Sequence, residues 1–460
     1  MSEIKKFLKA GGSELLRKAL DSGASSGGAL VHEYLEDIIT DQIVAQYPEW
    51  SLISPKKIGS KSYKYKARNA RGGVGGAVGE NADLTAQNST YTQPEITLKV
   101  IARQFSVTDF LRDSTSENLD AFAQELENEV NDQILSLNLY NLFGNAVADA
   151  YQYSGWDKSI LSNRNSAIFD GWSSGAATVP STLVPFDNMI NASNRKSGDR
   201  FKRAFIMSAD MASLLSRLYT TVRKNIDAPT IKLPGGHELE SYRGIPILQS
   251  TVISGAQSGT MTAVTATSGG TTGGALSDGA YYFRVSAITE TGETMASAES
   301  TVTLAGTGST QQINLTFTAY PGAIAYKVFY SATTGLSGMS LIRWMAAKTY
   351  DSNGTITGSV ATINLLNVTA NTTVTGISSD KPLTAVSSVN AESIYLVCFD
   401  DYQGMGRFAH NNSGQRENGL INFDMLGKSK MSEQAIISTR GAIIPAFEAT
   451  SVKASGWRPA

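Results

Sequence analysis

The chain has 460 residues, enough for two or three domains, and an ordinary apolar content of 41%. Its 39 basic and 41 acidic residues leave a net charge of −2, which excludes a general attraction to nucleic acid or to an anionic membrane. The single cysteine, Cys398, excludes a disulfide within the chain, and its apolar surroundings IYLVCF predict a buried thiol.

Residues 1–50 are predicted to form an N-terminal arm. The segment MSEIKKFLKAGGSELLRKAL has neither the apolar run nor the small-residue cleavage site of a signal peptide. Residues 30–47 carry apolar side chains at helical spacing, and Pro48 ends that pattern. No stretch has the apolar length that spans a bilayer, so we expect a protein that folds in a cytoplasm and contacts no membrane.

Residues 51–112 are predicted to form an extended hairpin loop. SYKYK alternates as a strand does, glycines cluster at 72–79, and PEITLKVIARQFSVT alternates again as the returning strand. Seven basic residues and no acid lie between Lys56 and Arg71. Basic and aromatic residues interleave there, as in proteins that bind single-stranded nucleic acid, but an acidic protein surface is the favoured partner. A two-stranded hairpin has little core, so we expect a neighbouring subunit to support it.

A long acidic helix follows the hairpin. Ser114 and Glu117 match the S-x-x-E capping box, apolar residues then recur at helical spacing, and Gly144 ends the helix. Residues 113–157 contain nine acids and no lysine or arginine. The opposed charges predict a contact in which the hairpin of one subunit docks on the helix of another. The predicted inter-subunit contact residues are Lys61, Lys64, Lys66, Arg68, Arg71, Glu117, Asp120, Glu125, Glu127 and Asp132.

Residues 256–385 differ in composition from the sequence on either side. Only eleven of them are charged, and Thr, Ser, Gly and Ala dominate. DGAYYFRVSAITETGE, QINLTFTAYPGAIAYKVFYS and SLIRWMAAKTYDSNG have the alternation and spacing of β-sandwich strands. We therefore expect an independent β-sandwich, replaceable by a short linker, inserted in an α+β host made of residues 113–255 and 386–460.

The sequence lacks the common catalytic and metal-binding patterns. His32, His237 and His410 are isolated, with no H-E-x-x-H motif and no cysteine pair. The glycines at 72–79 lack the spacing of a phosphate-binding loop, and no G-x-S-x-G occurs. We therefore expect neither an enzyme nor a cofactor or metal site.

The order of these segments resembles that of the major capsid proteins of tailed bacteriophages, which have the Hong Kong 97-type fold. The resemblance implies an N-terminal arm, an extended hairpin loop, a peripheral domain with a long spine helix, and an axial domain. SVTDFLRDS at 106–114 is similar to the turn into the peripheral domain, and YRGIPILQS at 242–250 to an axial-domain strand. The segments at 279–287 and 321–330 resemble immunoglobulin-like or fibronectin type III modules.

This resemblance implies an icosahedral shell of hexamers and pentamers around double-stranded DNA, located in the virion and assembled in the cytoplasm of a bacterial host. The implied partners are further copies of the chain, a separate scaffolding protein, a portal protein and non-specifically packaged DNA. The sandwich would project from the outer face, where many copies could contact host-surface glycans. A non-viral nanocompartment shell of the same fold and a surface adhesin are the alternatives.

Overall fold

The computed structural model describes residues 48–457 apart from internal gaps, of which the longest are 78–85, 110–120, 161–167, 369–391 and 412–419. The helix predicted at 30–47 and the predicted capping-box residues Ser114 and Glu117 therefore lie outside the described residues. The chain divides into two compact units. Unit 1 comprises Met1–Ser51, Ala102–Leu135 and Gly414–Thr439, and unit 2 comprises Leu52–Ile101, Ser136–Ser413 and Arg440–Ala460.

The predicted long helix is confirmed as α5 (Ala121–Phe143). Its buried residues in unit 1, Leu126, Val130 and Ile134, recur every fourth position and form one apolar face. Gly144 follows directly, and a Cβ atom there would lie 2.7 Å from the carbonyl oxygen of Tyr140, so the chain can turn here only without a side chain.

Unit 1 also contains strands that pair with the long strand β27 (Ser432–Ile444), namely β26 (Asn422–Ser429) and β6 (Lys99–Thr108). Three rings, one from each of β6, α5 and β26, form its aromatic cluster. The ring centroid of Phe105 lies 5.4 Å from that of Phe122 and 6.5 Å from that of Phe423. The strands and the first part of α5 therefore share one core.

The predicted single returning strand of the hairpin is wrong in one respect. PEITLKVIARQFSVT forms two strands, β5 (Glu95–Thr97) and β6, which are separated at Leu98. Leu98 is buried and its N–H donates to the carbonyl of Lys61, 3.0 Å away, after which the chain leaves the hairpin. β6 then pairs with β27, because Phe105 and Val107 on one of its faces belong to the core of unit 1.

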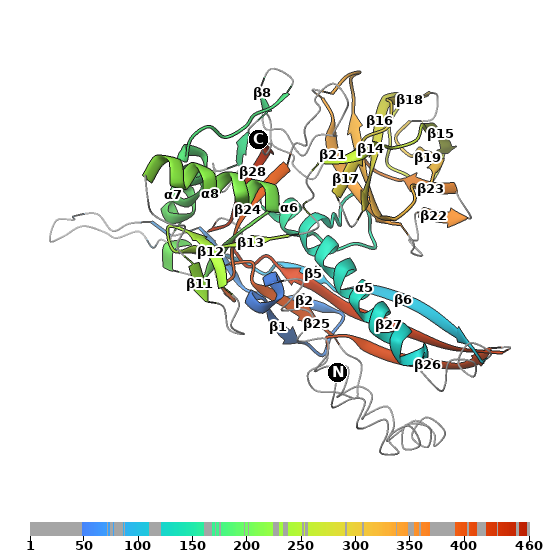
Figure 1. Cartoon of the computed structure of the whole chain (residues 1–460), viewed down its shortest axis with the longest axis horizontal. Coiled ribbons are helices and arrows are strands. Elements are labelled where there is room, and N and C mark those ends of the chain that lie inside the picture. The colour runs from blue at the N-terminus through green and yellow to red at the C-terminus, as the bar shows by residue number, and fades with distance from the viewer. Residues whose placement is uncertain are drawn as a thin grey trace, which may run out of the picture. The chain divides into compact units, whose positions relative to one another are not determined.

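Unit 2 contains a seven-stranded mixed sheet covered by two helices, α7 (Val184–Arg195) and α8 (Ala209–Arg223) (Figure 1). The strand order is β11 (Thr230–Lys232), β12 (Glu238–Tyr242), β13 (Ile245–Gln249), β10 (Arg203–Met207), β24 (Glu392–Cys398), β28 (Val452–Trp457) and β7 (Ile168–Asp170). Phe186 and Met211 on the helices pack with Phe205 of the central strand. β10 has the sequence RAFIM and β24 has ESIYLVC, and the buried thiol predicted for Cys398 is confirmed.

Two local features shape this sheet, and the second places a turn inside the segment 242–250 that was compared with a single strand. Ser208 caps α8, since its hydroxyl accepts a hydrogen bond of 3.2 Å from the N–H of Met211. Arg243 and Gly244 join β12 to β13, and both have positive φ angles, 52° and 78°, as a two-residue type I′ hairpin requires.

The remaining elements of unit 2 outside the segment 256–365 are short. They are η2 (Pro48–Leu52, which reaches unit 2 at its last residue), β1 (Ser54–Lys57), β2 (Ser62–Lys64), β3 (Ala67–Ala70), β4 (Thr90–Thr92), β5, α6 (Trp156–Ser159), β8 (Trp172–Ser173), β9 (Ala176–Ala177), η3 (Gly198–Arg200) and β25 (Arg407–His410). β25 pairs with β1 on one side and with the last residues of β27 on the other.

Residues 256–365, here named the β module, form two sheets around one core (Figure 1). The six-stranded sheet consists of β14 (Ala256–Thr260), β17 (Gly292–Met295), β16 (Gly279–Thr289), β20 (Ala323–Ser331) and β21 (Ser340–Ala346) in that order, with β18 (Ser300–Leu304) also paired to β16. The four-stranded sheet has the order β15 (Val264–Gly270), β19 (Gln312–Thr318), β23 (Val360–Leu365) and β22 (Gly354–Thr357). Phe283 and Val328 of the first sheet meet Leu315 and Ile363 of the second in the shared core.

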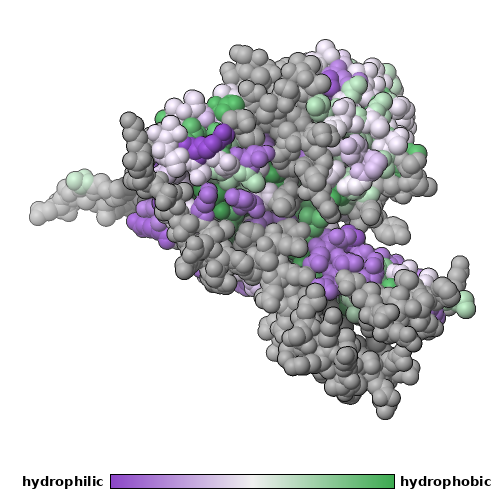
Figure 2. All heavy atoms as spheres, viewed as in Figure 1, coloured by the Kyte–Doolittle hydropathy of each residue, from purple (hydrophilic) through white to green (hydrophobic). Residues whose placement is uncertain are grey.

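The two sheets differ in burial. On β19, buried and partly exposed residues alternate, as expected for a strand with one face in the core. On β20, Ala325, Tyr326, Lys327, Val328 and Phe329 are all buried, so both faces of that sheet are covered. In Figure 2 the surface over the four-stranded sheet is pale, of intermediate hydropathy, whereas strongly hydrophilic atoms gather over α5.

Candidate assembly interface

The hairpin predicted to support assembly is a narrow two-stranded arm, defined here as residues 61–97. β2 pairs with β5, and β3 pairs with β4 farther along. Two tyrosines hold its base. The hydroxyl of Tyr65 donates to the carbonyl of Pro445 at 3.0 Å, and Arg407 donates to the hydroxyl of Tyr63 at 3.2 Å. These bonds join the arm to the segments that form the end of the β1–β25–β27 sheet.

The outer part of the arm has no core of its own among the described residues. All three residues of β4 are exposed, and 67% of Tyr91 is accessible to solvent. A two-stranded ribbon with this exposure is marginally stable in water unless another surface covers it. The sequence-based expectation of an unsupported arm therefore holds for β4.

The predicted basic contact residues lie along this arm. Lys64 forms an ion pair of 3.2 Å with Glu95 on the paired strand, and both side chains are about half exposed. A hydrogen bond from Ser62, followed by the bond and the charge of Lys64, lowers the pKa of Glu95. Lys61, Lys66 and Arg68 are exposed, and no ion pair with another described residue involves them. Arg71 lies outside the described residues.

The predicted acidic contact residues lie on α5. Glu125 and Glu127 are half-buried, and Asp132 is exposed, whereas Glu117 and Asp120 lie outside the described residues. The contact predicted between these acids and the arm joins two copies of the chain, and it stays a prediction.

Sequence reasoning missed Arg103, which partly neutralises the acidic helix within one chain. Its Nε lies 2.7 Å from a carboxylate oxygen of Glu129, and its Nη2 lies 2.8 Å from one of Asp132. The alternation of β6 could have indicated a partly buried Arg103 with acidic partners, because Arg103 shares a strand face with the buried Phe105.

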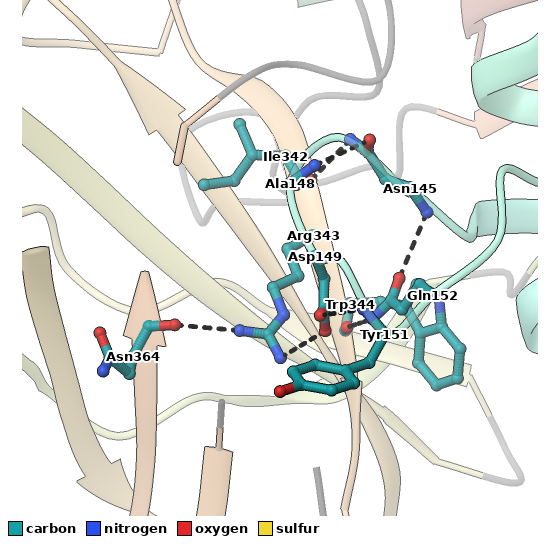
Figure 3. A network of polar contacts seen from close by, with 9 residues as sticks. All are labelled: Asn145, Ala148, Asp149, Tyr151, Gln152, Ile342, Arg343, Trp344 and Asn364. Atoms are coloured by element: carbon teal, nitrogen blue, oxygen red, sulfur yellow. Dashed lines mark hydrogen bonds and ion pairs between the residues drawn. The ribbon is translucent and has the colours of Figure 1, made fainter. Parts of the chain in front are cut away.

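A second feature that the sequence did not indicate is a buried joint between the β module and the segment that follows α5 (Figure 3). An ion pair of 3.0 Å joins Arg343 of β21 to Asp149, and each side chain is only 1% exposed. Two amides complete the contact, since Asn145 and Gln152 each donate a hydrogen bond of 3.1 Å, to the carbonyls of Ile342 and Trp344 respectively. The edge strand of the six-stranded sheet is thus held by side chains from outside the module.

Aromatic and charged groups extend the joint to the end of α5. The rings of Tyr140 and Trp344 meet edge to face with centroids 4.4 Å apart. The Nζ of Lys327 lies 4.8 Å from the ring centroid of Phe143 and 2.7 Å from a carboxylate oxygen of Glu293. The sequence feature that could have indicated this joint is a pair of cations, Lys327 and Arg343, in strands that are otherwise mostly apolar.

No catalytic or metal-binding constellation occurs in the part of the chain that the structure describes. No three His, Cys, Asp or Glu side chains within it lie close enough together to hold a metal ion. His410 is buried in β25, and its burial, followed by the charge of Lys57, lowers its pKa. Among the described helices, none is long and apolar enough to cross a membrane.

Comparison with known proteins gives structural similarity only. No protein-family model matches the sequence, and no curated protein is significantly similar to it. The chain is similar to the cyanophage A-1(L) capsid protein, with a TM-score of 0.46, 11% identity, and coverage of 90% of this chain and 92% of that one.

Two further solved assemblies have similar chains. For the holo-SrpI encapsulin complex of Synechococcus elongatus the TM-score is 0.42 at 10% identity, over 89% of this chain and 88% of that one. For the capsid of a native GTA particle it is 0.41 at 10% identity, over 88% of this chain and 90% of that one. Each is a protein that this chain resembles at low identity.

Proposed function

We propose that the chain is a shell-forming protein of the Hong Kong 97-type fold, acting as the major capsid protein of a tailed bacteriophage. The observation that carries this proposal is the arm, whose outer strand β4 is exposed at every residue. A chain keeps such a ribbon when a second copy covers it, and a repeated contact between unlike surfaces forms a ring when its rotation closes.

Charge supports the same arrangement. Lys61, Lys66 and Arg68 leave the arm positive, while α5 presents Glu125 and Glu127 along with the partly neutralised Asp132. One exposed pair contributes only about 0.2–1 kcal/mol, but complementary charge sets the register of a contact that a shell repeats many times. The arm of one subunit would lie on the helix of its neighbour.

The β module would be an inserted immunoglobulin-like sandwich on the outer face of the shell. Its four-stranded sheet has few charges, so it has little attraction for packaged DNA, whereas outside it could contact host-surface glycans in many copies. In this proposal the double-stranded genome fills the shell, and a scaffolding protein and a portal protein act in its assembly.

Electron microscopy and light scattering of the purified full chain test the proposal. We expect closed shells of uniform size from the natural chain. The triple variant Lys61→Glu, Lys66→Glu and Arg68→Glu should keep its circular dichroism spectrum and stop at small oligomers, because like charges would face each other at the arm contact. Reversal of three exposed cations elsewhere, Lys196, Arg200 and Lys202, is the matched control and should leave shells intact.

Three results would contradict or redirect the proposal. A natural chain that stays monomeric at high concentration would overturn it. Shells that purify with a protein cargo and no portal would identify a nanocompartment instead of a phage capsid. Binding of single-stranded oligonucleotides that only the arm variant loses would assign the arm to nucleic acid rather than to assembly.

A further inference from the structure

A lysine and an aspartate meet in the interior of unit 2, between the seven-stranded sheet and α6. The Nζ of Lys453, in β28, contacts Oδ1 of Asp157, in α6, and the two side chains are 0% and 1% exposed. The hydroxyl of Tyr395 donates a hydrogen bond of 2.9 Å to the same Oδ1, and Tyr395 lies opposite Lys453 in the register of β24 and β28. An amine, a carboxyl group and a phenol therefore converge on one oxygen atom, away from solvent.

The backbone holds these three groups in fixed positions. β24 and β28 are neighbouring interior strands, with β10 and β7 on their outer sides. α6 is anchored at its start, because the N–H of Gly155 donates to the carbonyl of Gly144 at 2.9 Å. The buried indole of Trp156 donates to the carbonyl of Met405 at 3.4 Å, which ties α6 to the segment that follows β24. Reactive groups held in contact have effective concentrations on the order of 10⁵–10⁸ M, so a reaction that is negligible between free side chains becomes feasible here.

Convergence on one oxygen distinguishes this ion pair from that of Lys327, the other buried lysine among the described residues. Lys327 donates to one oxygen of Glu293 at 2.7 Å, whereas the hydroxyl of Ser286 donates to the other oxygen at 2.5 Å. On Asp157 both donors meet Oδ1, so protons can be delivered to the oxygen that would have to leave the carboxyl group. We therefore expect condensation chemistry at Asp157 and not at Glu293.

Burial also favours a neutral product over the ion pair. Keeping an ammonium and a carboxylate out of water is unfavourable, and an amide between them removes both charges. Water, which would reverse the reaction, has little access to side chains that are 0% and 1% exposed. Burial lowers the pKa of the half-buried Lys158, against the charge of Asp157 and together with that of Lys453, so a second amine able to relay a proton lies nearby.

We propose that Lys453 and Asp157 condense into an intramolecular isopeptide bond that ties β28 to α6. The bond from Nζ to Cγ forms, and the bond from Cγ to Oδ1 breaks. Two of the three ammonium protons leave with Oδ1 as one water molecule, and the third stays on the amide nitrogen, so no further reactant is needed. Tyr395 assists by donating its hydrogen bond to the departing oxygen. The reaction occurs once in each chain, so this is a modification site and not an active site. This inference does not depend on the proposed function.

Mass spectrometry of the natural full chain under denaturing conditions tests the bond directly. We expect an intact mass lower by one water molecule than the mass calculated from the sequence. Tryptic digestion should give a branched peptide in which Lys453 is joined to Asp157, with no cleavage after Lys453. An intact mass equal to the calculated one would overturn the proposal. Loss of water without the branched peptide would overturn it too, because an aspartate that closes on its own backbone loses the same mass.

Matched variants assign the bond to its residues. Lys453→Arg keeps the positive charge but cannot form the amide, so its mass should equal the calculated one. Lys327→Arg, the same change at the other buried lysine, is the control and should still lose one water molecule. A water loss that persists in Lys453→Arg would overturn the proposal, and the mass of the natural chain decides it even if that variant does not fold.

A time course tests the part assigned to Tyr395. Samples of newly synthesised chain should show the unreacted mass first and the lower mass later. Tyr395→Phe removes the hydrogen bond to the departing oxygen and keeps the ring, so its conversion should be about a hundredfold slower. Conversion of Tyr395→Phe at the natural rate would overturn the assignment of the hydroxyl as the assisting group.

Discussion

The two sheets of the β module come from one stretch of similar composition, yet they have different surroundings. The four-stranded sheet alternates between core and solvent, with Thr265, Thr316 and Thr362 side by side in one register row on its outward face. The six-stranded sheet buries both faces along β20 and carries buried cations on β20 (Lys327) and on its edge strand β21 (Arg343). The four-stranded sheet thus has one face in solvent, whereas the six-stranded sheet attaches the module to residues outside it.

The difference in burial between the two sheets shows where the few charged residues of this segment lie. Of the eleven charged residues in 256–385, Glu293, Lys327 and Arg343 are buried at the joint. Burying a charge is unfavourable unless a partner is fixed beside it, and each of these has one. We infer that the joint holds the module in one orientation, because a flexible tether would leave these groups in water.

The largest effect should come from Asp149→Asn. The variant keeps the hydrogen bond from the N–H of Tyr151 to the side chain, but leaves the buried Arg343 without a counter-charge. Breaking one side of a buried ion pair costs about 3–5 kcal/mol, and urea unfolding of the full chain should show a loss of this size. The double variant Asp149→Asn with Arg343→Met should recover most of it. A single variant that loses less than about 1 kcal/mol would mean that the joint does not stabilise the chain.

A smaller effect is expected at the partly exposed pairs of unit 1. Arg103→Met keeps the aliphatic packing of the side chain and removes its bonds to Glu129 and Asp132. We expect a loss of about 1 kcal/mol that shrinks in 1 M salt, because solvent ions screen exposed charges. The loss at Asp149 should barely respond to salt. If both losses respond equally, the contrast between a buried joint and an exposed helix surface is wrong.

The smallest effect should come from Thr265→Cys on the four-stranded sheet. The residue is exposed, so the free energy of unfolding should change by no more than about 0.5 kcal/mol. A maleimide attached to a large polymer should label it, while Cys398 stays unlabelled because burial raises the pKa of that thiol. Ala325→Cys, on the buried β20, is the negative control. Labelling that is complete in the free chain and lost in assembled particles would contradict an outward-facing module.

Local patterns were enough to predict α5, much of the hairpin and several strands of the module. These elements follow from helical spacing and strand alternation, which act over a few residues. The partner of β6 could not be predicted, because an alternating strand specifies which face is buried but not which strand lies beside it.

The joint could not be predicted from the sequence for a similar reason. Arg343 and Asp149 are 194 residues apart, and nothing near either of them indicates the other. A lone cation in an apolar strand does indicate a buried anionic partner. Lys327 and Arg343 could therefore have predicted that such partners exist, but not which residues they are. Arg103 was likewise visible on the core face of its strand, while its two acidic partners were not.

The ion pair of Arg343 and Asp149 also constrains how the β module can be exchanged during evolution. A different β domain acquired by recombination at this point would arrive without the arginine and would leave a solitary carboxylate in an apolar contact. Selection against that loss should keep residues 144–152 and the module together, so related chains should have both halves of the joint or neither. The module is then a heritable part of this architecture, and grafting another domain in its place requires transplanting the acidic segment as well.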